Sequence, residues 1–134
     1  MPSQLRLQRI ADRIREELSE MVVTEISDPR LSGISITDAK VDREFTFADI
    51  FVSAVEGHER AEEVLAGLNH ASGYIRKNLA ARVDLRIFPR LRFHWDPTPE
   101  KADHIEQILA SLRKENQDKP SPEDNLEGKD RDGE

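Results

Sequence analysis

The stretch NHASGYIRKNLAARVDLRIFPRLRFHW, residues 69–95, decides the fold. Apolar residues at helical spacing precede and follow the segment Ala71-Ser72-Gly73, whose own residues favour a helix poorly. Because a glycine inside a helix costs roughly 1 kcal/mol relative to alanine, we predict two helices with a structural kink at these three residues. The end of the stretch, 86–95, alternates between apolar and polar side chains, which predicts a strand.

The strand predicted over 86–95 has two unlike faces. Its odd positions are apolar, and its even positions carry Arg86, Phe88, Arg90, Arg92 and His94. The even positions therefore predict a basic face with one aromatic ring. Pro89 cannot donate a hydrogen bond to a neighbouring strand, so this strand either lies at the edge of a sheet or contains a bulge.

The rest of the chain supplies partners for this stretch. Amphipathic and alternating patterns predict a helix over 5–26, strands over 34–37 and 46–54, a helix over 59–83 that contains the kink, and a helix from 98 to about 114. A short polar connection between the first two strands predicts an antiparallel hairpin. The order α-β-β-α-kink-α-β plus a C-terminal helix predicts an α+β fold, a three-stranded sheet covered by helices. We expect the apolar stripe of the last helix to be buried.

Charge divides the chain into a folded part and a tail. The net charge is −7, and residues 115–134 alone hold eight acids and three bases. Leu126 is the one large apolar side chain of this segment, so the segment cannot bury enough surface to offset the cost of ordering it. We therefore predict one folded domain over 1–114 and a disordered acidic tail over 115–134.

Composition and motifs exclude several classes of protein. The sequence has no cysteine, which rules out disulfides and cysteine-ligated zinc and fits the cytoplasm. The sequence has no run of about eighteen apolar residues, so it predicts no membrane span. The histidines lack metal-ligand spacing, and no phosphate-binding loop or nucleophile motif is present. We therefore expect no enzyme activity, cofactor, metal site or membrane partner.

Local charge favours a nucleic-acid binder. Between 76 and 92 a single acid, Asp84, stands among six bases. Arginine pairs with phosphate and stacks on bases, so this segment predicts contact with RNA. The candidate RNA-binding residues are Arg76, Lys77, Arg82, Arg86, Arg90 and Arg92. Additional candidates are Arg6, Arg9, Arg13 and, as a stacking ring, Phe88.

Other interpretations of these residues stay open. The basic face is equally explained as a solvated surface whose charge is offset by acids on neighbouring elements. Packing of Phe88 under the C-terminal helix is an equally good interpretation of this residue. The arginines of the first helix can instead form ion pairs with acids of the same helix at helical spacing. A protein–protein module that uses Phe47 and Phe51, with incidental affinity for RNA, is the alternative function.

Several fragments resemble one family in their order and spacing. They are Arg9-Ile10-Ala11, Asp28-Pro29-Arg30-Leu31, Ala48-Asp49-Ile50-Phe51-Val52-Ser53, Gly73-Tyr74-Ile75-Arg76 and Arg86-Ile87-x-Pro89-x-Leu91-x-Phe93. KH domains bind single-stranded nucleic acid at a Gly-x-x-Gly loop between two helices, and this loop is missing here. The chain resembles the ribosome-binding factor A family, in which a kinked Ala-x-Gly stands in the place of that loop.

The resemblance covers about residues 6–112 and implies a KH-like fold of the type II order. It implies a ribosome-binding factor that binds the free, immature small ribosomal subunit and its ribosomal RNA near the decoding region. Such a protein assists late maturation of that RNA and matters most in the cold. The implied mechanism is steric and electrostatic, with no bond made or broken. Nothing in the sequence calls for more than a monomer.

Overall fold

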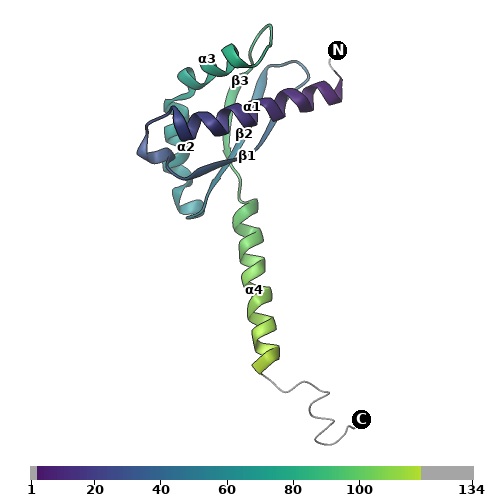
Figure 1. Cartoon of the computed structure of the whole chain (residues 1–134), viewed down its shortest axis with the longest axis vertical. Helices are drawn as coiled ribbons and strands as arrows, with labels where there is room; N and C mark the ends of the chain where they lie inside the picture. Colours follow the sequence, from purple (N-terminus) through teal and green to yellow (C-terminus); the bar gives the residue numbers. More distant parts are fainter. Residues whose placement is uncertain (1–2, 119–134) are drawn as a thin grey trace, which may run out of the picture. The chain divides into compact units, whose positions relative to one another are not determined.

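The computed structural model describes residues 3–118, and the chain divides into two compact units, 1–97 and 98–134. The first unit contains α1 (Gln4–Thr24), η1 (Pro29–Leu31), β1 (Ile34–Val41), β2 (Phe47–Ala54), η2 (His58–Arg60), α2 (Ala61–His70), α3 (Ser72–Arg82) and β3 (Arg90–Trp95). The second unit contains α4 (Thr98–Asp118). This order, visible in Figure 1, confirms the predicted α+β fold class.

The sheet has the strand order β1-β2-β3, with β1 and β2 antiparallel and β2 and β3 parallel. The predicted hairpin is therefore confirmed, and the register between its strands shifts between Ile36 and Asp38, as in a β-bulge. A parallel pair needs a long crossover connection, and α2 and α3 provide it. Ala48, Ile50 and Val52 of β2 are fully buried, so one face of the sheet belongs to the core.

Helix α1 crosses the sheet, as Figure 1 shows, and closes the core. Ser3 caps its N-terminus by accepting a hydrogen bond from the backbone N–H of Arg6 at 3.1 Å. Its buried stripe consists of Leu7, Ala11, Ile14, Leu18, Met21 and Val22. The chain then turns at Asp28, whose carboxylate accepts a hydrogen bond from the backbone N–H of Arg30 at 2.9 Å and so begins η1.

The predicted kink is confirmed. Helix α2 ends at His70 and α3 begins at Ser72, with Ala71 between them at φ −86° and ψ 3°. The two glycines near the kink differ in their surroundings. A Cβ at Gly67 would lie 2.9 Å from Cδ2 of Leu31 and 3.2 Å from Cβ of Arg30, whereas a Cβ at Gly73 would meet nothing within 4 Å. Gly67 therefore lets α2 pack closely on η1.

Replacing Gly67 with alanine is expected to lower the free energy of unfolding by about 1 kcal/mol. Overpacking a core contact costs about 1–3 kcal/mol, and the better helix propensity of alanine offsets part of that cost. Gly73→Ala is the matched control, and it should leave stability unchanged or raise it. Urea unfolding read by circular dichroism measures both variants. Equal effects at the two positions would show that the contact with Leu31 does not matter.

The third strand begins later than predicted. β3 starts at Arg90, so Arg86 lies in the loop before it and the predicted strand face is shorter. Phe88 is 7% exposed and belongs to the hydrophobic core. The expectation of a stacking ring at Phe88 is therefore wrong. Pro89 is fully buried, and its missing N–H explains why strand pairing starts only after it.

Helix α4 extends to Asp118, so the predicted boundary at residue 114 lies inside it. Within the second unit, its apolar side chains Ile105, Ile108, Leu109 and Leu112 are 42–56% exposed, and the expected burial of this stripe stays a prediction. Residues 119–134 of the predicted acidic tail lie outside the described residues. Within the described part of the chain, none of the helices combines the length and the apolar character needed to cross a membrane.

Candidate nucleic-acid interface

The two arginines predicted on α3 face different neighbours. Arg76 and Arg82 are six residues apart, which separates them by about 120° around a helix axis. The guanidinium of Arg76 donates hydrogen bonds to the carbonyl oxygens of Phe88 at 2.6 Å and Pro89 at 3.2 Å. The guanidinium of Arg82 instead faces α1. The basic residues predicted from the sequence therefore do not share one face.

Arg82 is paired with acids of the N-terminal helix region. Its Nη2 lies 2.6 Å from Oε2 of Glu25, and its Nη1 lies 3.7 Å from Oε1 of Glu17. The hydrogen bond to Glu25 raises the pKa of Arg82 above its ordinary value. These ion pairs tie α3 to α1. Because two carboxylates offset the charge of Arg82, this residue attracts a phosphate only weakly.

Arg86 and Arg90 lie on either side of residues 87–89 before β3, and Arg76 and Lys77 lie on α3, which Arg76 ties to that segment. We call Arg76, Lys77, Arg86 and Arg90 the cation cluster. All four are exposed, and none forms an ion pair with an acid within residues 3–118. Arg76 binds only neutral carbonyl groups, so it keeps its full positive charge. Its two hydrogen bonds also hold the segment 88–89, which lies between Arg86 and Arg90, against α3.

The other basic residues of β3 lie on the sheet face that points away from the core. The open sheet face includes Asp38, Lys40, Phe47, Asp49, Phe51, Arg90, Arg92 and His94. At its centre Asp49 accepts hydrogen bonds from Nε and Nη2 of Arg92 at 2.8 and 3.0 Å. Nε2 of His94 lies 2.7 Å from Oδ1 of Asp49.

The carboxylate of Asp49 organises this face electrostatically. Its hydrogen bond with Arg92, and secondly that with His94, hold the pKa of Asp49 below its ordinary value. The same contact raises the pKa of Arg92. A bidentate arginine–carboxylate pair is geometrically specific, so Arg92 is held in one orientation.

Aromatic rings lie beneath the cations of the open sheet face. Cζ of Arg92 is 3.9 Å from the centre of the Phe47 ring. The rings of Phe51 and His94 stack with centres 5.1 Å apart and planes 27° apart, and Nζ of Lys40 lies 5.5 Å from the centre of Phe51. The sequence assigned Phe47 and Phe51 to a protein-binding alternative and did not single out Asp49. The alternation along β2 places Phe47, Asp49 and Phe51 on one face, and this was the sequence signal that could have identified the group.

The additional candidates on α1 fall into two groups. Arg13 pairs with Glu17 at 3.3 Å, as the alternative interpretation expected. Arg6 is exposed and lines a pocket of about 400 Å³ together with Arg86, Ile87 and the acid Glu44. Arg9 is exposed on the same helix. Arg6 thus lies close to Arg86 of the cation cluster and to Glu44, while Arg13 forms an ion pair with Glu17.

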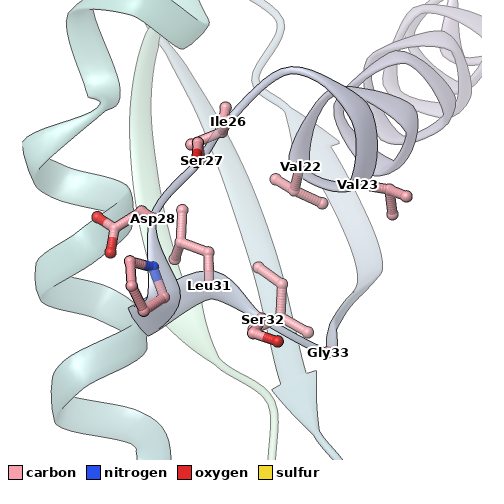
Figure 2. A pocket seen from close by; sticks show the side chains of 10 residues that line it. Val22, Val23, Ile26, Ser27, Asp28, Leu31, Ser32 and Gly33 are labelled. Carbon is pink, nitrogen blue, oxygen red and sulfur yellow. The ribbon is translucent and has the colours of Figure 1, made fainter.

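A larger pocket, of about 560 Å³, lies where α1 is connected to β1 (Figure 2). Val22, Val23 and Leu31 contribute apolar side chains, and Asp28 is its one ionisable lining residue. The carboxylate of Asp28 is already engaged by the guanidinium of Arg30 at 2.8 Å. Within residues 3–118 no group of three potential metal ligands comes together. This pocket therefore lacks the polar groups of a catalytic or metal centre.

Comparisons with known proteins agree with this architecture. A family model described as "Ribosome-binding factor A" matches residues 6–109. The "Ribosome-binding factor A" of Alcanivorax borkumensis is 37% identical over 124 residues, which cover 92% of this chain and 90% of the relative.

Solved structures give the same result for the fold. The crystal structure of ribosome-binding factor A from Thermus thermophilus matches with a TM-score of 0.60 and 24% identity, over 66% of this chain and 93% of that one. A homology model of the Thermus thermophilus protein, fitted into a cryo-EM map of a 30S complex, matches with a TM-score of 0.54 and 25% identity, over 65% and 91% of the chains. The chain belongs to the ribosome-binding factor A family.

Proposed function

We propose that this protein binds the small ribosomal subunit through its ribosomal RNA and assists late maturation of that RNA. Membership of the ribosome-binding factor A family supports this function, as does the likeness to a protein fitted into a 30S complex. The action is binding alone and involves no catalysis. It takes place in the cytoplasm on the free, immature subunit, and one copy of the chain suffices.

The observation that carries the proposal is the cation cluster. Arg76, Lys77, Arg86 and Arg90 are exposed and have no acid partner within the described residues, so their charge is available to phosphates. Cations that neutralise RNA phosphates release condensed counterions, which gives affinity without sequence preference. Arg82 and Arg92 carry the same charge but have carboxylates beside them. We therefore place the phosphate contacts at the cation cluster.

The mechanism follows from rigid positioning. Arg76 fixes the backbone before β3 through two carbonyl groups, so the backbone positions of Arg86 and Arg90 relative to α3 are set when RNA is absent. A preorganised set of cations binds a matching arrangement of phosphates at a lower entropic cost than a flexible one. Such a surface holds one RNA conformation of the immature subunit. It loses its contacts when that conformation changes.

Co-sedimentation with purified small subunits over a salt series tests the proposal. The triple variant Lys77→Ala, Arg86→Ala, Arg90→Ala should flatten the slope of log affinity against log salt by about 2, at about 0.7 for each phosphate contact. The charge-matched control replaces Arg43, Lys101 and Arg113, three exposed cations elsewhere in the sequence, with alanine. It should leave the slope nearly unchanged.

Two results would contradict the proposal. Equal effects of the triple variant and its control would show that net charge, and not the cluster, governs binding. Binding of the unmodified chain that does not prefer small over large subunits, or that hardly depends on salt, would favour the protein–protein alternative.

A further inference from the structure

The open sheet face holds one arginine in an unusual arrangement. A guanidinium is planar and has two faces and an edge that carries its N–H donors. Asp49 binds that edge of Arg92, at 2.8 and 3.0 Å, and the ring of Phe47 lies under one face, with Cζ 3.9 Å from the ring centre. The second face remains, and the side chain is 50% exposed.

We propose that the second face of the Arg92 guanidinium is a stacking site for an unpaired base of single-stranded RNA. This site rests on the proposed function and adds a second contact to it, separate from the phosphate contacts of the cation cluster. Arginine stacks on planar π systems, and base stacking in proteins is tolerant of sequence because every base has a flat face. Phe47, Arg92 and the base then form three layers.

Asp49 acts as a positioning residue for this site. It does not compete with the base, because it binds the edge of the guanidinium and leaves the outer face open. The same carboxylate contacts His94, whose ring stacks on Phe51 and is 43% exposed. One acid thus fixes two neighbouring flat groups, which reduces the entropy lost when a base binds.

Two cations flank Arg92 on the open sheet face, which also carries Asp38 beside Phe51, and the charge of Asp42 acts on Arg92. Lys40 pairs in register with Asp49, and Arg90 pairs with Phe47, so both lie on the open sheet face. Neither forms an ion pair with an acid within residues 3–118. Cations that flank flat stacking groups suit the phosphates on either side of an unpaired base. A double helix hides its base faces, so the site selects single strands.

Fluorescence of a single-stranded decaribonucleotide with one 2-aminopurine tests the site on the full chain. Stacking should quench the fluorescence when the unmodified protein binds. Arg92→Lys keeps the charge and removes the planar group, and it should abolish the quenching and weaken binding about tenfold. Phe47→Leu should act in the same direction, because Arg92 loses the ring that supports it. Arg82→Lys, a change of the same kind at the α1–α3 contact, should do neither.

The outcomes separate this site from the proposed function. Unchanged quenching and affinity for Arg92→Lys would overturn the stacking site. If the triple variant of the cation cluster still lost small-subunit binding in that case, the proposed function would stand without it. An unmodified protein that binds small subunits but not the single strand would also overturn the site. Binding to neither would overturn both proposals.

Discussion

Replacing Arg60 with alanine is expected to lower the free energy of unfolding by about 3 kcal/mol. Its guanidinium donates hydrogen bonds to the carbonyl oxygens of Ser32 at 2.6 Å and Arg30 at 2.9 Å, and its side chain is 15% exposed. A hydrogen bond to a charged group contributes about 1.5–3 kcal/mol, and both carbonyls lose this partner at once. Thermal or urea unfolding read by circular dichroism measures the loss.

Two further variants identify the cause of this effect. Arg60 also pairs with the exposed carboxylates of Glu56 at 3.1 Å and Glu63 at 3.2 Å, and exposed pairs add little stability. Glu63→Gln should therefore cause only a small fraction of the loss. Arg60→Lys lacks the forked donor arrangement and should fall between the wild type and alanine. If Glu63→Gln matched the alanine variant, the ion pairs would hold η1 and the carbonyl contacts would not.

The sequence predicted the fold well because the patterns that define it are local. Apolar spacing identified each α-helix of the first unit but not the short helix η1, and Ala71-Ser72-Gly73 marked the break between α2 and α3. The start of β3 was wrong for a physical reason. The alternation of apolar and polar residues continued through 86–89, but those residues are not paired in the sheet, and there Ile87 is 71% exposed while Phe88 is buried. Phe88 reaches the core from a loop whose carbonyls bind Arg76.

The candidate site was less predictable because its electrostatics depend on distant residues. Arg82 and Arg90 look alike in the sequence. Arg82 meets Glu25, which is 57 positions away, whereas Arg90 meets no acid within the described residues. The contact between Arg92 and Asp49 spans 43 positions and requires the parallel pairing of β2 with β3. The strand order decides this pairing, and periodicity alone does not specify strand order.

The contact of Arg76 with the segment before β3 links the stability of the fold to the arrangement of the cation cluster. The carbonyl oxygens of Phe88 and Pro89 belong to buried residues, and Arg76 is the side chain that donates to both. Arg76→Ala is expected to lower the free energy of unfolding by about 2 kcal/mol. Lys77→Ala, the neighbouring exposed cation on the same helix, should change it by less than about 0.5 kcal/mol.

The two variants should also differ in binding to small subunits, measured well below the unfolding midpoint. Each removes one positive charge, so a purely electrostatic role predicts equal losses of affinity. Arg76→Ala should lose clearly more, because the segment that places Arg86 and Arg90 is no longer held against α3. Arg76→Lys restores the charge without the forked donors, so it should keep the salt dependence of the wild type and still lose affinity. Equal affinities for Arg76→Ala and Lys77→Ala would show that the arrangement of the cluster does not depend on Arg76.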